Sequence, residues 1–154
     1  MVVYVSDLLS HKMKTIGSGQ PLKEAAKLMN NLGISSLIVI ENGKAVGIIT
    51  ERDMMRSLML DLVNLHKISV RTFMSSNLIT IKENAFIEDA IELMVNNRIK
   101  RLLVTGAIGT ESKLIGIISM TDIVSKHPEL KSRFDALEKQ MGELDNYPYL
   151  NILS

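Results

Sequence analysis

The sequence contains no cysteine, and this absence excludes disulfide bonds, thiolate metal sites and cysteine nucleophiles. Its three histidines, His11, His66 and His127, are scattered, and no two have the i, i+4 spacing of a helical metal pair. Neither a Gly-x-Ser-x-Gly nucleophile motif nor a phosphate-loop lysine motif occurs. We therefore expect no catalytic residue, no metal site and no catalytic cofactor, and interpret the chain as a non-enzyme.

An excess of one charge is also lacking. The chain has 18 Lys and Arg residues against 17 Asp and Glu residues, which gives a formal net charge of +1. A protein that binds a polyanion usually carries a basic excess over its surface. The charge balance therefore argues against a nucleic-acid partner.

Long hydrophobic runs are absent too. No stretch approaches the ~18 consecutive apolar residues that a membrane span needs, and the first residues lack the charged and apolar pattern of a leader peptide. With 154 residues and 46% hydrophobic content, the chain can bury one sizeable core. We expect a cytoplasmic protein without a membrane partner, folded as one compact domain or two small associated ones.

The most informative feature that is present is an internal repeat. Thr15 and Ile34 recur 65 residues later as Thr80 and Ile99. After a four-residue insertion around Gly106 to Lys113 the offset becomes 69, and the chain is therefore an internal duplication. The other recurring pairs include Ala25 and Ala90, Met29 and Met94, Leu37 and Leu102, Val39 and Val104, Gly47 and Gly116, and Asp53 and Asp122.

Each copy has the pattern of a β-α-β-β-α unit. A short β-branched stretch leads into a segment with helical spacing from Leu22 to Met29, and Gly33 is suited to the left-handed position just past the helix. The dipeptide Asn42-Gly43 between two β-rich runs predicts a two-residue hairpin turn. A second helix follows the hairpin in each copy.

These patterns predict an α/β (α+β) fold of two β-α-β-β-α repeats, related by pseudo-twofold symmetry around a shared cleft. We expect domains at 1–66 and 67–127 and a C-terminal helical extension at 128–154. The extension carries an apolar stripe that predicts an amphipathic helix, packed on its own module or across a homodimer. That stripe consists of Leu130, Phe134, Leu137, Met141 and Leu144.

A strand-to-helix motif closes each copy, from Gly47 to Asp53 and from Gly116 to Asp122. Both fit glycine, two apolar residues, a hydroxyl residue, any two residues, then Asp. One interpretation is a helix capping box, in which hydroxyl and carboxylate satisfy the first amides of the helix. The other is a nucleotide site, where helix amides and the hydroxyl face phosphate and the carboxylate accepts both hydroxyls of a ribose.

A basic cluster distinguishes the second copy. Arg98, Lys100 and Arg101 stand just before a β run, where the first copy has Ser35 and Ser36 at the two positions matching Lys100 and Arg101. Because arginine can engage phosphate bidentately, we expect the second site to hold phosphate better than the first. The alternative for Arg98 is a solvated cation at the end of a helix.

The duplicated unit, the segment Glu24 to Met29 and the closing motif Val46 to Asp53 resemble the CBS domain (cystathionine beta-synthase domain), paired as a Bateman module. The resemblance covers roughly residues 5 to 126. It implies a regulatory sensor that binds AMP, ADP, ATP or S-adenosylmethionine. The implied second site, which is favoured, consists of Thr80, Ile99, Lys100, Arg101, Ile117, Ser119, Thr121 and Asp122; the implied first site consists of Thr15, Ile34, Ser35, Ser36, Ile48, Thr50, Arg52 and Asp53.

Within that resemblance the two aspartates would bind ribose hydroxyls, the isoleucines would form the apolar slot for the base, and Lys100 with Arg101 would face phosphate. The first copy departs from the pattern at Ser35 and Ser36. We expect an adenine nucleotide of the AMP, ADP or ATP type as ligand, a homodimer, and an unidentified regulated protein as partner. The alternatives are a scaffold with an empty pocket, S-adenosylmethionine binding, and nucleic-acid binding through the Arg98 to Arg101 cluster.

Overall fold

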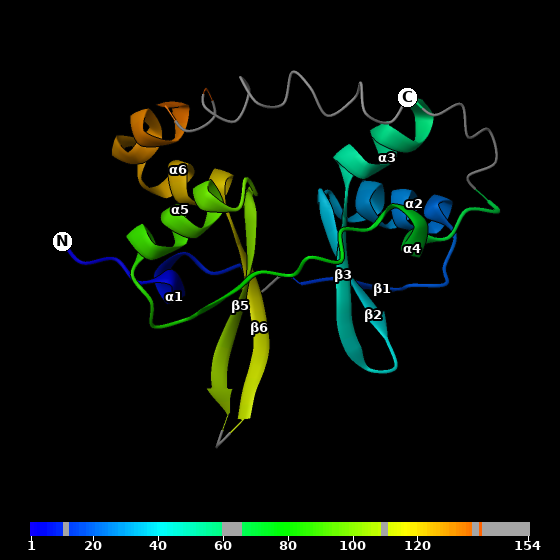
Figure 1. The fold of residues 1–154 in the computed structure, drawn as a ribbon, viewed down its shortest axis with the longest axis horizontal. Helices are drawn as coiled ribbons and strands as arrows, with labels where there is room; N and C mark the ends of the chain where they lie inside the picture. The colour runs from blue at the N-terminus through cyan, green and yellow to red at the C-terminus, as the bar shows by residue number, and fades with distance from the viewer. Residues whose placement is uncertain (11–12, 60–65, 109–110, 137–138, 140–154) are drawn as a thin grey trace. The chain divides into compact units, whose positions relative to one another are not determined.

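The computed structural model describes residues 1–10, 13–59, 66–108, 111–136 and 139 (Figure 1). The described residues pack as two compact units. We name the unit of Lys12–Ile79 the first-repeat unit, and the unit of Met1–His11 with Thr80–Ser154 the second-repeat unit. Among the described residues, no helix combines the length and the apolar content required to cross a membrane.

Each unit contains one three-stranded sheet and short helices, which confirms the predicted mixed α+β class. In both sheets the first strand is parallel and the last strand antiparallel to the central one. The first-repeat unit comprises β1(Thr15–Gly17), α2(Leu22–Leu32), β2(Ser36–Glu41), β3(Lys44–Thr50), α3(Glu51–Met59) and α4(Val70–Phe73). The second-repeat unit comprises α1(Val5–Leu8), β4(Thr80–Lys82), α5(Ile87–Asn96), β5(Arg101–Ile108), β6(Glu111–Ser119), α6(Met120–Lys126) and the 3-10 turn Pro128–Leu130.

The turn chemistry agrees with the sequence. Asn42 and Gly43 both have positive φ, of 49° and 74°, as the predicted two-residue hairpin requires. Gly33 follows α2 in the left-handed conformation, with φ 62°. In the second copy Arg98 holds that position with φ 53°, a conformation that side chains other than glycine rarely adopt.

The four inserted residues lengthen the second hairpin. β5 has 8 residues where β2 has 6, and β6 has 9 where β3 has 7. The last pair of the first hairpin, Glu41 with Lys44, matches Gly106 with Lys113, and two further pairs extend the second hairpin beyond it. The insertion therefore lies in the hairpin, as the change of the repeat offset from 65 to 69 predicted. The strand-to-helix end of the sheet keeps the same pairing in both units.

The core of the first-repeat unit lies between α2 and one face of its sheet. Leu22, Ala25 and Met29 project from α2 and are buried, as the helical spacing predicts. They pack with Leu37 and Val39, which alternate along β2 and therefore share one face. The strand residues of the predicted site, Thr15, Ser36, Ile48 and Thr50, are in register with the alternate positions of β2 and therefore lie on the opposite face of the sheet.

The C-terminal extension is described only in part. Residues 131–136 are helical, and Phe134 is buried at 2% exposure, in agreement with the predicted apolar stripe. Leu137, Met141 and Leu144 lie outside the described residues. The domain limits at 66 and 127 stay a prediction.

Each unit takes its leading helix from the segment that precedes the other repeat. α4 precedes the second repeat, yet the backbone amides of Val70 and Arg71 bond to Gln20 and Ser18 of the first-repeat unit. α1 stands at the start of the chain and makes the equivalent bonds to the second-repeat unit, where Val5 donates to the carbonyl of Ala85 at 2.9 Å. The sequence patterns did not indicate either helix, because one turn is too short to show a period.

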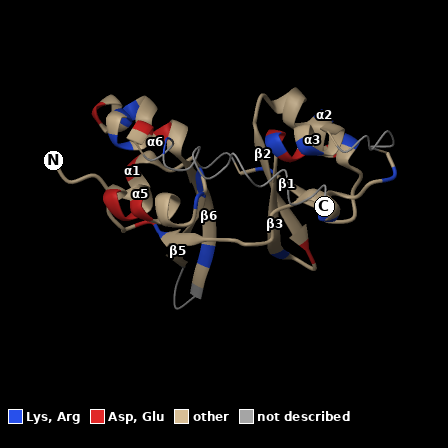
Figure 2. Cartoon of the chain, turned by 45° about the horizontal axis from the view of Figure 1, so that its top comes forward, with Lys and Arg blue, Asp and Glu red and all other residues tan. Residues whose placement is uncertain are grey.

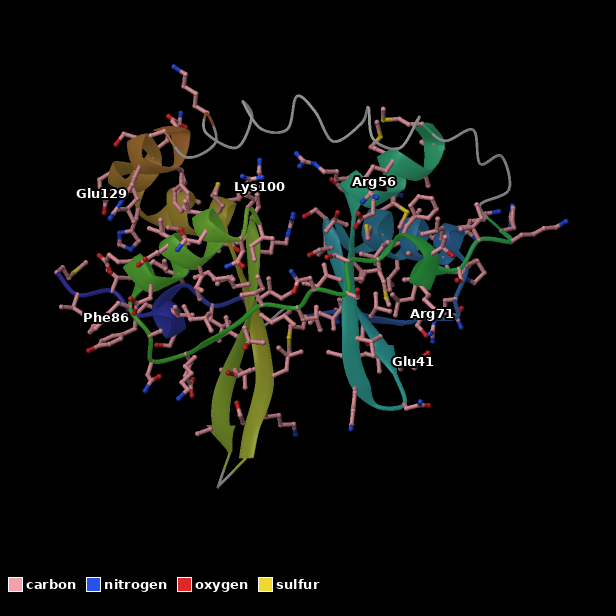
Figure 3. The ribbon with its side chains drawn as sticks, in the orientation of Figure 1. Glu41, Arg56, Arg71, Phe86, Lys100 and Glu129 are labelled. Atoms are coloured by element: carbon pink, nitrogen blue, oxygen red, sulfur yellow. The ribbon has the colours of Figure 1, made fainter. Side chains whose placement is uncertain are left out.

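Side chains add to the attachment of α4. The ion pair between Arg71 and Glu41 joins α4 to the end of β2, and both side chains are labelled in Figure 3. The buried hydroxyl of Ser18 donates to Glu41 at 2.9 Å and accepts from Arg71 at 3.3 Å. This polar cluster satisfies a buried hydroxyl and fixes the helix at the same time.

The glycine of the closing motif lies where each leading segment reaches the sheet. Ile48 and Ser75 exchange two backbone hydrogen bonds of 2.9 Å, and Ser10 pairs with Ile117 in the same way. A Cβ at Gly47 would lie 2.9 Å from the carbonyl oxygen of Ser75. At Gly116 it would lie 2.8 Å from the carbonyl oxygen of Ser10. The motif glycine is thus explained by close backbone packing, without a ligand.

Replacing either glycine by alanine should loosen the leading segment. We expect Gly47→Ala and Gly116→Ala each to lower the free energy of unfolding by about 1–3 kcal/mol, the usual range for overpacking. Gly19→Ala is the matched control, because a Cβ there meets nothing within 4 Å. Urea unfolding of the three variants measures the effect, and equal stabilities would contradict the packing role.

Candidate functional site

The first candidate corner joins β3 to α3. Thr50 donates to Oδ2 of Asp53 twice, from its backbone amide at 2.8 Å and from its hydroxyl at 3.0 Å. The hydroxyl in turn accepts from the amide of Asp53 at 3.4 Å. The other oxygen, Oδ1, accepts from Nη1 of Arg56 at 3.3 Å. Asp53 is buried at 7% exposure, and both of its carboxylate oxygens have a partner.

The second candidate corner joins β6 to α6 and repeats the cap. Ser119 donates to Oδ2 of Asp122 from its amide at 3.0 Å and from its hydroxyl at 2.5 Å, and it accepts from the amide of Asp122 at 3.1 Å. Ser119 is the N-cap of α6 in a capping box. Within the described part of the chain, Oδ1 of Asp122 has no hydrogen-bond partner.

The capping interpretation is therefore confirmed at both corners. In each cap the carboxylate accepts from the backbone amide of the hydroxyl residue, and the hydroxyl accepts from the amide of the aspartate. Such a cap is worth about 0.5–2 kcal/mol. Capping and ligand binding are compatible because the cap uses only Oδ2. At Asp122 the second oxygen remains available to accept hydrogen bonds, whereas at Asp53 it is engaged by Arg56.

The strand entrances lie directly beside these corners. Ser36 is the register partner of Thr50, and Arg101 is the register partner of Ser119. Backbone bonds tie the preceding residues to the helices, since Glu51 donates to the carbonyl of Ser35 at 3.0 Å and Met120 donates to that of Lys100 at 2.9 Å. The structure thus brings the predicted hydroxyl, acid and strand-entrance residues together in each unit.

Strand register gathers further predicted residues on the same face. Thr15, Ile38 and Ile48 form one row across the first sheet, and Thr80, Leu103 and Ile117 form the matching row in the second. Register partners point to the same side of a sheet. Ile38 and Leu103 were missing from the predicted site, although their alternation with Leu37 and Leu102 could have indicated them.

The remaining predicted residues differ in exposure. Ile34 and Ile99 are half-buried between helix and strand, and Ile34 also packs against the core. Arg52 and Thr121 are exposed in the first turn of their helices. Each predicted site lies within one unit, and the shared cleft between the repeats stays a prediction.

Basic residues are distributed differently at the two corners, as Figure 2 shows for α3 and for the start of β5. In the second-repeat unit Lys100 directly precedes β5 and Arg101 is its first residue, and both cations are half-buried. In the first-repeat unit the cations Arg52 and Arg56 stand on α3 instead. Figure 3 labels Lys100 and Arg56 at these two positions. Among the described residues there is no group of three side chains suited to hold a metal ion.

Comparison with known proteins gives a consistent result. The CBS domain model matches residues 5–60 and 70–129. An uncharacterized protein of Methanopyrus kandleri is 32% identical over 82% of this chain and 65% of its own length. Inosine-5'-monophosphate dehydrogenase of Methanocaldococcus jannaschii is 34% identical over 75% of this chain, yet the match spans 22% of that enzyme. The chain therefore spans less than two thirds of these relatives.

One of the similar solved structures contains bound ligands. It is the CBS domain pair of protein MJ0100 in complex with 5'-methylthioadenosine and S-adenosyl-L-methionine. Its TM-score is 0.71 at 26% sequence identity, with coverage of 84% of this chain and 98% of that one. The similarity supports the repeat architecture across nearly the whole of that domain pair.

Proposed function

The chain belongs to the CBS domain family, and from this premise we propose that it is a regulatory module that binds an adenine nucleotide at the second-repeat corner. The observation that carries the proposal is Oδ1 of Asp122, an acceptor without a partner in the described part of the chain. A carboxylate oxygen is a strong acceptor for ribose hydroxyls. The cap holds this carboxylate in place before any ligand arrives.

The neighbouring groups support a phosphorylated ligand. Arg101 lies in register with Ser119, so its strand position adjoins the corner that holds Asp122. Guanidinium groups bind phosphate in a bidentate geometry, which favours AMP, ADP or ATP over a neutral nucleoside. The half-buried Ile99 and Ile117 supply apolar surface for a base.

S-adenosylmethionine is the second candidate ligand. A similar domain pair is described in complex with this molecule and with 5'-methylthioadenosine, and both contain an adenosine moiety. The basic cluster of the second-repeat unit favours phosphate over a sulfonium cation. The proposal includes a ligand-dependent shift between two conformations that acts on a separate cytoplasmic protein. Identical scattering profiles with and without a tight ligand would contradict that shift.

A panel of AMP, ADP, ATP, S-adenosylmethionine and GTP tests the ligand class. We expect an adenine nucleotide to raise the melting temperature, since a ligand at 100 times its Kd stabilises by about 2.7 kcal/mol. Asp122→Asn should weaken binding about tenfold, measured by calorimetry, while its amide oxygen still caps α6. Asp122→Ala is unsuitable, because the lost cap would itself lower the melting temperature.

Asp89→Asn is the matched control for that panel. Asp89 also accepts from a backbone amide at a helix start, that of Phe86 at 3.2 Å, but it lies on α5 away from the corner. We expect this variant to keep the affinity of the unaltered protein. If no member of the panel raises the melting temperature, the scaffold interpretation replaces ligand binding.

We also propose that the chain forms a homodimer through α3. Met55, Leu58 and Met59 are 60%, 56% and 68% exposed, and their i, i+3, i+4 spacing places them on one face of the helix. Three adjacent large apolar side chains left in water favour association with another surface. Flexible methionines suit such a contact because they adapt to the partner.

Sedimentation equilibrium tests the dimer. The unaltered chain should show twice the monomer mass of 17.2 kDa, and Leu58→Glu should shift it to the monomer. Leu32→Glu, at a residue 43% exposed on α2, is the control and should remain dimeric. A monomeric unaltered chain would contradict the proposal.

A further inference from the structure

The two corners differ in how their carboxylates are occupied. In the first-repeat unit, Oδ1 of Asp53 accepts from Nη1 of Arg56 at 3.3 Å. In the second-repeat unit the position that matches Arg56 is Ser125, and Oδ1 of Asp122 lacks a partner in the described part of the chain. The duplication therefore preserved the cap and changed the group that faces the second carboxylate oxygen.

A ribose diol needs both of its hydroxyls to donate to acceptors. At Asp53 the cap uses Oδ2 and the guanidinium contacts Oδ1, so a diol competes with Arg56 for that oxygen. The side chain of Arg56 is 44% exposed, whereas that of Asp53 is 10% exposed. The carboxylate is held by its surroundings, and the guanidinium is the partner that is able to move.

The charges near Asp53 determine which ligand can displace the guanidinium of Arg56. The strand entrance of this unit has Ser35 and Ser36 in place of a basic pair, and the described cations of α3 are Arg52 and Arg56. A phosphate offers the Arg56 guanidinium a charge-assisted bond that replaces the one to Asp53. A nucleoside without phosphate would have to separate the ion pair between Arg56 and Asp53, and it would offer the guanidinium no anion in exchange.

We propose that Arg56 is the specificity-determining residue of the first-repeat corner. In the ligand-free protein it holds the carboxylate of Asp53, and it releases this carboxylate to a nucleotide whose phosphate takes its place. The corner therefore discriminates against adenosine in favour of AMP. This inference rests on the proposed function, because it assumes that the corners bind adenine nucleotides.

The test uses the full chain with Asp122→Asn, which weakens the second corner, and measures AMP and adenosine binding by calorimetry. Adding Arg56→Ser places in the first corner the residue found in the second. We expect adenosine to bind about twofold to fivefold tighter, because an exposed ion pair no longer competes with it. We expect AMP to bind about tenfold weaker, because a charge-assisted bond to phosphate is lost.

Lys27→Ser in the same background is the matched control. Lys27 forms a similar exposed i, i+3 ion pair in this unit, with Glu24 at 3.4 Å on α2. It should leave the ratio of AMP to adenosine affinity unchanged. If Arg56→Ser also leaves the ratio of AMP to adenosine affinity unchanged, the inference is overturned, and Arg56 is only a surface partner of Asp53.

Two further outcomes separate this inference from the proposed function. If the unaltered chain binds AMP but the Asp122→Asn variant shows no remaining AMP site, the first corner is not a site and this inference alone fails. If the unaltered chain binds neither AMP nor adenosine, the proposed function fails and the inference fails with it.

Discussion

The strand-to-helix corner depends on one carboxylate that closes the first turn of the helix after the sheet. Thr50 with Asp53, and Ser119 with Asp122, satisfy amides that no helical carbonyl can reach. The same bonds fix the carboxylate in one orientation. A group held in this way by its cap is preorganised to accept hydrogen bonds from a ligand. Under the proposed function, stability and ligand binding share this side chain and use different oxygens of it.

Duplication preserved the backbone and varied the side chains around it. The register shift after Val39 recurs after Val104, and the glycine that admits the leading segment recurs as well. The insertion adds the pairs Ala107 with Ser112 and Ile108 with Glu111 at the end of the sheet away from the corner. Near the corner, by contrast, the cations change from the strand entrance in one repeat to the helix in the other. The two repeats therefore share one scaffold and differ in the arrangement of charges at their corners.

Local patterns predicted the local features of this fold. The Asn42-Gly43 turn and the left-handed Gly33 follow from backbone preferences of single residues, and the corner follows from a four-residue motif. The place of the leading helices could not be predicted, because it depends on contacts between distant segments. The left-handed conformation of Arg98 could not be predicted, because residues other than glycine rarely adopt it.

The sequence motifs indicated the residues of the two corners, but they did not indicate all the hydrogen-bond partners of those residues. The motif indicated Asp53 and Asp122, and strand register placed Thr15 and Ile48 on the same face as expected for one surface. The ion pair of Arg56 with Asp53 has a sequence signal, since residues three apart on a helix are neighbours. That signal does not tell which of two oxygens the guanidinium occupies, and this detail decides how the two corners differ.

The proposed function depends most directly on Oδ1 of Asp122 as the acceptor for a ribose hydroxyl. Calorimetry with AMP and 2'-deoxy-AMP compares ligands that differ by one hydroxyl and carry the same phosphate. We expect the deoxy ligand to bind about tenfold weaker, which is the effect of one lost hydrogen bond to a charged group. Equal affinities would show that the 2'-hydroxyl makes no such bond and would contradict the diol contact that the proposed function requires.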